Sequence, residues 1–305
     1  MTQPAISRVL APVVTPFDQQ LEVDVNRLIS HCQWLIDNNV GLAVFGTNSE
    51  ANSMSANEKV DVLNRLHDAG LPPSQMMPGT GCCSIDDTVL LTRTSVSLGC
   101  TGVLMLPPFY YKNVSDEGLF RHFSEVVERV ADDRLRVYLY HIPPIAQVGI
   151  SLDLIDRLLD AYPKTFAGIK DSSGDWNNTE AMLKRFASRG FEIFSGAETF
   201  LLDNCRGGGA GCISATANVH PGPIATLAEN WQSDDAVQQQ QRLNDIRSAF
   251  EGYVMIPSLK AAIAAYSDDD EWIRVRPPLV ELDESQRQHL VTTLVERSFE
   301  MPGLI

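Results

Sequence analysis

The feature of this sequence that most limits its possible folds is a repeated alternation of short apolar runs with amphipathic helical patterns. The first apolar run covers residues 9–15 and ends at Pro16, and apolar residues then recur at helical spacing from Val25 to Ile36. The same two-part pattern continues until eight apolar runs have been completed. The later runs cover residues 41–45, 76–81, 102–106, 136–142, 166–170, 191–195 and 211–215. Apolar strands separated by helical crossovers predict a parallel sheet that is covered on both faces.

Eight strand–helix units favour a closed α/β architecture, the (β/α)8 TIM barrel, over an open doubly wound sheet. No GxGxxG or GxxxxGK(S/T) motif follows any of the apolar runs, so dinucleotide binding and P-loop chemistry are not indicated. After Pro221 the alternation stops, and helices are expected over residues 237–249, 256–266 and 284–299. We therefore expect a catalytic barrel over residues 1–231 and a C-terminal helical extension over residues 232–305.

The charge balance and the spacing of potential ligand residues exclude several classes of partner. The formal net charge is -15, so nucleic acids and anionic membranes are not expected as partners, whereas a small anionic substrate remains compatible with a local pocket. The N-terminal region has no continuous apolar segment of signal or membrane length, so we expect a cytoplasmic protein. Asp, Glu, His and Cys do not cluster at metal-ligand spacing, which predicts a mechanism without a metal.

Lys170 closes the sixth apolar run directly before a group of turn residues. An unpaired ammonium is costly to bury, and a desolvated lysine amine attacks a ketone to form an iminium, which serves as an electron sink. Lys170 is therefore our candidate Schiff-base residue. The alternative is a strand-end lysine that extends to water or pairs with Asp171.

Chemical partners for this lysine are expected at the ends of neighbouring strands, because the carboxyl ends of barrel strands meet at one mouth. Tyr140 ends the preceding apolar run, and Thr47 and Asn48 follow the second run. A phenol beside an iminium can transfer protons, Thr47 can orient that phenol, and backbone N–H groups of the 47–48 loop can hold a carboxylate. The alternative for Tyr140 is a core tyrosine with a satisfied hydroxyl.

Strand periodicity adds three expectations about these runs. Gly168 shares a face with Lys170 and is expected to leave space beneath the lysine for a small ligand. Tyr138 shares a face with Tyr140 and is more simply explained as a core residue, while His141 points to the opposite face and is expected to pack against a helix. Tyr110 and Tyr111, after the fourth run, fit either the site or an aromatic subunit contact.

Several segments, taken in order, carry a resemblance to a known family. They are residues 11–17, the loop Gly46-Thr47-Asn48-Ser49-Glu50, Tyr140 with Ile142-Pro143, and residues 168–172, 195–196, 211–214 and 276–279. Together they resemble the dihydrodipicolinate synthase and N-acetylneuraminate lyase superfamily of pyruvate-handling, Schiff-base aldolases. The resemblance extends over nearly the whole chain.

The resemblance implies roles for individual residues. Lys170 would form the iminium with the keto carbon of a 2-oxo acid such as pyruvate, and Tyr140 would be the acid/base. Thr47 and Asn48 would bind the substrate carboxylate, and the Ile213 main chain would line the site. The Schiff base would form on the lysine itself, so no separate cofactor is implied.

Further roles follow from the same resemblance. Ser172, Gly196 and Glu198 would contact the substrate, with Ser172 and Glu198 facing its hydroxyl groups. Tyr111 matches a tyrosine that reaches into a neighbouring subunit to complete a Thr-Tyr-Tyr proton relay. The resemblance also implies a homotetramer assembled as a dimer of dimers.

Two departures from the family pattern shape the functional hypothesis. Ser49 stands where the usual loop has a second glycine, so the local backbone is expected to differ. Ile145 stands five residues after Tyr140, where the synthases carry an arginine that holds the second substrate's carboxylate. Without that guanidinium a bidentate carboxylate clamp is lost.

We therefore expect a Schiff-base aldolase or lyase that cleaves or forms a 2-oxo acid from pyruvate and an aldehyde. The alternatives are 4-hydroxy-tetrahydrodipicolinate synthase, acting on pyruvate and aspartate semialdehyde, and a 2-keto-3-deoxy acid dehydratase. A non-catalytic barrel that only binds 2-oxo acids is the alternative from outside the enzymes. A lysine placed beside a proton relay favours the enzymes, because binding alone needs no iminium.

Overall fold

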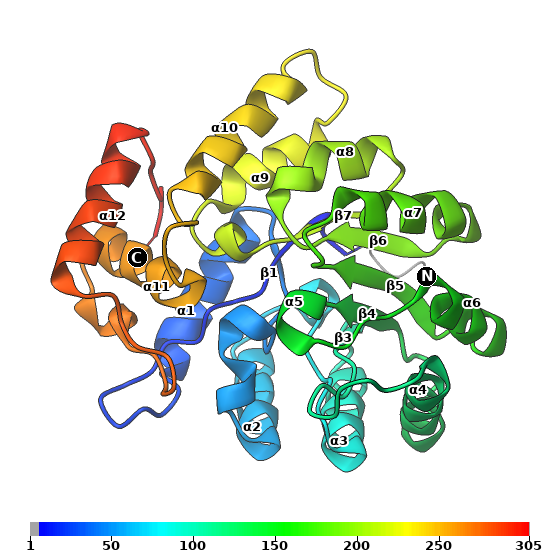
Figure 1. Cartoon of the computed structure of the whole chain (residues 1–305). Helices are drawn as coiled ribbons and strands as arrows, with labels where there is room; N and C mark the ends of the chain where they lie inside the picture. The colour runs from blue at the N-terminus through cyan, green and yellow to red at the C-terminus, as the bar shows by residue number, and fades with distance from the viewer. Residues whose placement is uncertain (1–5, 305) are drawn as a thin grey trace.

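The computed structural model describes residues 6–304. At its centre is a curled parallel sheet of seven strands in the order β2-β1-β7-β6-β5-β4-β3 (Figure 1). All the pairings between these strands are parallel. The strands are β1 (Val9–Ala11), β2 (Gly41–Leu42), β3 (Val103–Met105), β4 (Val137–His141), β5 (Phe166–Asp171), β6 (Glu192–Ser195) and β7 (Gly211–Ile213).

The two edges of the sheet, β2 and β3, are connected through residues 76–79. Met76 forms an isolated parallel bridge with Leu42, and Gly79 forms another with Leu104. This segment was expected to be the third strand, but it contributes only these two bridges. Pro78 has no N–H to donate, although its carbonyl accepts a hydrogen bond of 2.8 Å from Leu104 N.

Helices follow the strands and lie around the outside of the sheet (Figure 1). Many begin at a side-chain cap, and the predicted capping box of Ser55 and Glu58 is confirmed at the start of α2. The helices up to α9 are α1 (Val25–Asp37), α2 (Ala56–Asp68), α3 (Ile85–Ser97), α4 (Asp116–Val130), α5 (Pro143–Ala146), α6 (Leu152–Ala161), α7 (Trp176–Phe186), α8 (Leu201–Arg206) and α9 (Pro221–Glu229). Short 3-10 helices are η1 (Thr47–Ser49), η2 (Ala51–Ser53), η3 (Pro73–Gln75), η4 (Ala187–Arg189), η5 (Glu198–Phe200), η6 (Ala215–Asn218) and η7 (Asp270–Ile273).

Three further helices follow α9: α10 (Ala236–Ser248), α11 (Met255–Ser267) and α12 (Glu284–Glu296). Their buried side chains, such as Leu259 and Leu290, belong to the same apolar cluster as Leu28 of α1 and Val9 of β1. The C-terminal helices and the first strand–helix unit therefore share one apolar cluster.

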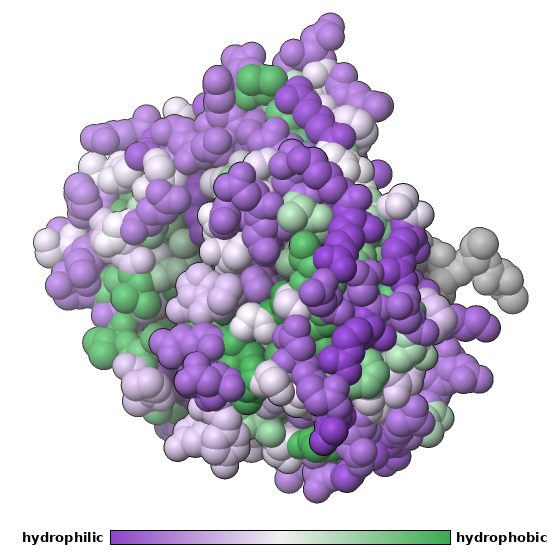
Figure 2. Space-filling model, turned by 45° about the vertical axis from the view of Figure 1, so that its right-hand side comes forward, coloured by the Kyte–Doolittle hydropathy of each residue, from purple (hydrophilic) through white to green (hydrophobic). Residues whose placement is uncertain are grey.

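The inside of the curled sheet is filled by side chains. Leu10, Leu104, Tyr138, Tyr140 and Phe194 form one buried cluster there, whereas the alternate residues of the same strands pack outward against the helices. Alternation along β4 places both tyrosines on one face, as predicted, and that face points into the sheet interior. On the face shown in Figure 2, hydrophobic side chains form several small patches between hydrophilic ones. None of the helices described for residues 6–304 has the length and apolar character that a bilayer crossing requires.

We predict that Gly79→Ala destabilises the protein strongly. A Cβ at Gly79 would lie 2.1 Å from the Phe45 carbonyl oxygen, so the backbone at the junction of the two sheet edges would have to move. The free energy of unfolding, measured by urea denaturation, should fall by about 3 kcal/mol or more. Gly252→Ala is the matched control, because no atom lies within 4 Å of the added carbon. That variant should be unchanged or up to about 1 kcal/mol more stable, and equal losses in both variants would contradict the prediction.

Candidate active site at the carboxyl ends of the strands

Lys170 and Tyr140 lie side by side near the carboxyl ends of β5 and β4. The two residues are register partners in the parallel pair. Lys170 Nζ donates a hydrogen bond of 3.3 Å to Tyr140 Oη, and it lies 4.4 Å from the centroid of the tyrosine ring. Both residues are buried, at 3% and 4% exposure. A buried amine is thus held directly beside a phenol.

Asp171 is not the ionic partner of this lysine. Its carboxylate instead accepts hydrogen bonds from Ser173 N at 2.9 Å, Asn178 Nδ2 at 3.0 Å and Thr179 Oγ1 at 2.7 Å. Within residues 6–304, Lys170 forms no ion pair. The simple alternative of a strand-end lysine paired with the next residue is therefore wrong.

Thr47 continues the line of hydroxyl groups from Tyr140. Thr47 Oγ1 lies 3.1 Å from Tyr140 Oη, at the start of the short helix η1. The Ser49 that departs from the family pattern supports this loop, because Gly46 N donates to Ser49 Oγ at 3.1 Å and Thr15 Oγ1 donates to Ser49 O at 2.7 Å. The first of these bonds uses the serine hydroxyl and is lost in a glycine, whereas the second uses the main-chain oxygen that any residue offers.

The expected space beneath the lysine is absent. A Cβ at Gly168 would lie 2.7 Å from the Tyr138 ring and 2.3 Å from the Glu192 carbonyl oxygen. The prediction that Gly168 leaves room for a ligand is therefore wrong, because the neighbouring tyrosine ring already fills that volume. Tyr138 donates its hydroxyl to Glu192, and burial together with this carboxylate raises the pKa of Tyr138 well above its usual value. Tyr138 is a core residue of the sheet interior.

His141 faces away from the site, as expected from strand alternation. Its Nδ1 accepts a hydrogen bond of 3.0 Å from Ile150 N. Burial lowers the pKa of His141, and nearby Asp171 partly opposes this effect. The imidazole therefore serves to hold the chain after α5.

A cavity of about 270 Å³ opens at the mouth of the sheet above the lysine. Six residues predicted from the sequence line it: Thr47, Asn48, Tyr140, Lys170, Ser172 and Gly196. Its volume lies near the lower end of the range for small-molecule sites, which favours a small ligand. A larger hollow of about 460 Å³ lies near Arg8 and Val9, at the amino end of β1, and contains none of these residues.

Three other predicted site residues lie outside the cavity lining. Ile213 is fully buried in the sheet interior. Glu198 is 1% exposed, and its carboxylate accepts hydrogen bonds from the hydroxyls of Ser214 and Thr216. Tyr111 is 75% exposed and packs edge-on against Tyr110. None of these three predicted residues therefore forms part of the cavity wall.

Two residues of the cavity wall come from the C-terminal helices and were not predicted, Arg247 from α10 and Met255 from the start of α11. Arg247 Nη1 lies 3.2 Å from a carboxylate oxygen of Glu198, and its buried Nε has no hydrogen-bond partner within the described chain. No local motif marks either residue. Both residues reach the cavity because α10 and α11 lie at the mouth of the sheet, a contact that only the tertiary structure shows.

Comparisons with known proteins agree with this arrangement. A sequence model described as the dihydrodipicolinate synthetase family matches residues 5–297. A protein from Chloroflexus aurantiacus described as an uncharacterized DapA-like lyase is 31% identical over 281 residues, covering 91% of this chain and 92% of that protein.

Solved structures show the same similarity in three dimensions. A dihydrodipicolinate synthase from Agrobacterium tumefaciens superposes with a TM-score of 0.87 at 30% identity, covering 94% of this chain and 98% of its own. A prophage protein of the dihydrodipicolinic acid synthase family from E. coli K12, solved in complex with pyruvate, gives a TM-score of 0.87 at 25% identity and covers 96% and 99% of the two chains. The family resemblance seen in the sequence is confirmed.

We predict that Ser49→Ala weakens the loop that carries Thr47. Removing the hydroxyl leaves the buried Gly46 N–H without its acceptor, so the free energy of unfolding should fall by about 1–2 kcal/mol. Ser53→Ala is the control, because the Ser53 hydroxyl forms no hydrogen bond within residues 6–304. Only its main-chain oxygen accepts one from a side chain, that of Arg276, and the substitution keeps that oxygen. Urea denaturation of both variants tests this, and an unchanged Ser49→Ala would show that the bond does not stabilise the loop.

Proposed function

Because this chain belongs to the dihydrodipicolinate synthetase family, we propose that it is a class I aldolase or lyase that cleaves or forms a 2-oxo acid from pyruvate and an aldehyde. One observation carries the proposal. The Lys170 amine, the Tyr140 hydroxyl and the Thr47 hydroxyl form a continuous line at the wall of one small cavity, with separations of 3.3 Å and 3.1 Å. The family member from E. coli K12 that was solved with pyruvate supports pyruvate as the 2-oxo acid.

In the proposed reaction, the Lys170 amine attacks the keto carbon of the substrate, Tyr140 gives its phenolic proton to the leaving hydroxide, and loss of water gives an iminium. The resulting Tyr140 phenolate removes the proton from the hydroxyl at C4. The C3–C4 bond then breaks, its electron pair flows into the iminium, and the aldehyde leaves. The resulting enamine takes this proton back from Tyr140 at C3, and water then adds to the iminium, returns a proton to the phenolate, releases pyruvate and regenerates the amine. Thr47 orients the Tyr140 hydroxyl during these proton transfers.

The 47–48 loop supplies the proposed carboxylate site. Thr47 and Asn48 open η1, so their N–H groups have no acceptor inside that helix. Both residues line the cavity beside Lys170. A carboxylate bound there would hold the keto carbon of a 2-oxo acid one bond away, within reach of the amine.

The domain and assembly hypotheses belong to the same proposal. Residues 1–231 would form the catalytic (β/α)8 barrel and residues 232–305 the helical extension, and the reaction would use the covalent lysine Schiff base without a cofactor. We place the enzyme in the cytoplasm as a homotetramer, in which Tyr111 reaches a neighbouring subunit's relay. The high exposure of Tyr110 and Tyr111 supports a contact role, since aromatic side chains are enriched in protein interfaces.

A second candidate function is favoured by Arg247. Ile145, where a synthase carries arginine, lies at the cavity with 62% of its surface exposed and has no charge to offer a second carboxylate. Arg247 lines the same cavity and has a guanidinium nitrogen without a partner in the described chain. It can therefore replace the missing clamp for 4-hydroxy-tetrahydrodipicolinate synthase or for any aldehyde with an acid group. Sugar-acid and dehydratase substrates use the same iminium and remain alternatives.

Borohydride trapping tests the central proposal. Incubation with pyruvate and borohydride should add one reduced pyruvate to the protein, and peptide mass spectrometry should locate it on Lys170. Tyr140→Phe should still be trapped but should turn over about 100-fold more slowly, because it lacks the proton-transferring hydroxyl. Lys170→Arg is the control that removes the nucleophile. Absence of any adduct on the wild-type protein would leave only a binding protein.

Aspartate semialdehyde separates the two enzyme functions. We expect little turnover of this aldehyde with pyruvate, because Ile145 cannot bind its carboxylate. Rapid, saturable turnover would contradict that expectation and favour the synthase. If such turnover occurs, Arg247→Gln tests whether Arg247 is the replacement clamp: KM for the semialdehyde should rise about tenfold or more, while pyruvate trapping should not change.

A further inference from the structure

A buried ion pair connects the loop of residues 46–50, which carries the proposed carboxylate site, to the C-terminal helices. Lys260 of α11 and Glu50 of the loop both have fully buried side chains, and Lys260 Nζ donates to Glu50 Oε1 at 2.5 Å. The same amine donates to Arg274 O at 2.6 Å, and Arg276 N donates to the second carboxylate oxygen of Glu50 at 2.8 Å. Both oxygens of Glu50 are therefore held by residues from the C-terminal segment.

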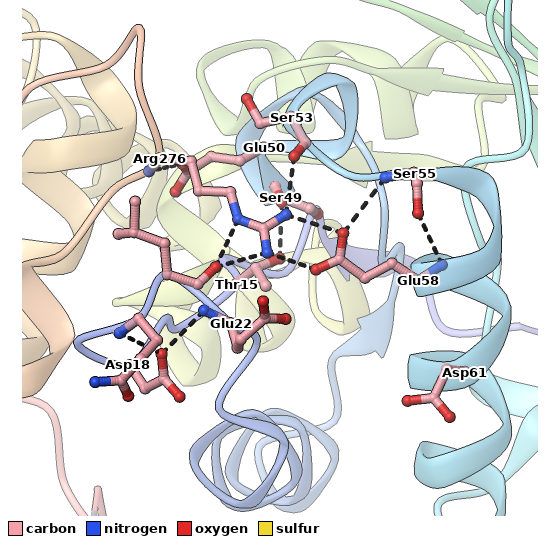
Figure 3. A network of polar contacts seen from close by, with 12 residues as sticks. Thr15, Asp18, Glu22, Ser49, Glu50, Ser53, Ser55, Glu58, Asp61 and Arg276 are labelled. Atoms are coloured by element: carbon pink, nitrogen blue, oxygen red, sulfur yellow. Dashed lines mark hydrogen bonds and ion pairs between the residues drawn. The ribbon is translucent and has the colours of Figure 1, made fainter.

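Arg276 extends this connection to the surrounding chain. Its guanidinium donates to Leu21 O, to Ser53 O and to both carboxylate oxygens of Glu58. Figure 3 shows the guanidinium lying between Ser53 and Glu58. One arginine thus joins the end of η2 and the first turn of α2 to the chain before α1.

Glu50 has a backbone conformation that requires such support. Its φ of 57° and ψ of 31° are in the left-handed region, which costs a residue with a side chain roughly 1 kcal/mol or more. Glu50 ends η1, and its N–H donates to Thr47 O at 3.1 Å. The position of the Glu50 side chain is therefore transmitted to Thr47 through one short helical turn.

Stability alone is a poor explanation for this buried pair. Removing two charges from water costs free energy that their attraction offsets only partly, and apolar replacements of buried pairs are often neutral or stabilising. The pKa of Lys260 shows this cost, since burial lowers it to about 8 although Glu50 opposes the shift. A role in holding one loop conformation accounts for the pair better.

We infer that Lys260 and Arg276 are positioning residues, which hold Glu50 and thereby place Thr47 and Asn48 where the substrate carboxylate and the Tyr140 hydroxyl require them. Neither residue lines the cavity, and α11 contacts η1 directly. The inference rests on the proposed function for its chemistry and goes beyond it by making the C-terminal segment part of the carboxylate site. Loss of either residue should weaken binding of the 2-oxo acid and slow proton transfer, while Lys170 should remain able to react.

The first test measures how pyruvate concentration controls trapping. In Lys260→Met the concentration for half-maximal trapping should rise about tenfold or more, while saturating pyruvate should still label Lys170. Lys260→Arg should recover part of the affinity, because it restores a cation that can reach Glu50. Arg27→Gln is the matched control: it breaks an ion pair of α1 with Asp269, also in the C-terminal segment, without touching the loop. A half-maximal concentration within twofold of wild type in Lys260→Met would overturn the inference.

A double variant separates positioning from stability. Glu50→Gln with Lys260→Met removes both buried charges, so its melting temperature should recover toward wild type relative to Lys260→Met alone. Its pyruvate affinity should remain low, because the loop has lost its anchor. If affinity recovers together with melting temperature, the pair is only structural and the inference is wrong.

A final measurement does not depend on the proposed chemistry. Hydrogen exchange of a peptide covering residues 46–54 should be faster in Lys260→Met than in the wild type and unchanged in Arg27→Gln. Unchanged exchange in Lys260→Met would overturn the positioning role. Failure of the wild-type protein to form any pyruvate adduct would instead refute the proposed function, and the exchange result would still decide whether Lys260 holds the loop.

Discussion

The contact between the Lys170 amine and the Tyr140 hydroxyl depends on the parallel register of β4 and β5. Because successive side chains alternate between the two faces of a strand, a slip of one residue would turn either group out of the sheet interior. The register is held from both sides. Tyr138 fills the space over Gly168 inside the sheet, and outside it Asp171 binds Asn178 and Thr179 at the start of α7. These packing and hydrogen-bond constraints place a buried amine beside a phenol, and the proposed chemistry requires that placement.

The C-terminal helices complete the mouth of the sheet by two routes. Arg247 and Met255 reach the cavity wall directly. Lys260 and Arg276 act at a distance, through a carboxylate in the loop that carries Thr47. The extension and the sheet also share one apolar cluster, so these polar contacts rest on a common hydrophobic core. The division into a barrel and a C-terminal extension therefore follows the order of the chain. The cavity and its loop, in contrast, are formed by residues of both parts.

Particular residues show how far sequence reasoning extended. The pairing of Tyr140 with Lys170 and the nearness of Thr47 followed from strand ends, and the geometry agrees with both. The expected cleft over Gly168 was wrong, because a missing side chain leaves space only if no neighbouring residue fills it, and Tyr138 does. The third expected strand was reduced to two bridges, because Pro78 cannot donate to a ladder. Ser49 was expected to change the local backbone, and its hydroxyl accepts a hydrogen bond from Gly46 N that a glycine at this position could not accept.

The sequence by itself determined the order of strands and helices, and with it the end of the sheet where reactive side chains meet. It could do so because strand and helix periodicities are local and parallel strands share one direction. Only the tertiary structure decided what surrounds that end. The partners of Glu50 lie more than 200 positions away along the chain, and no local pattern specifies a contact over that separation. Burial and charge pairing between distant segments, which exist only once the chain has closed on itself, therefore complete the site.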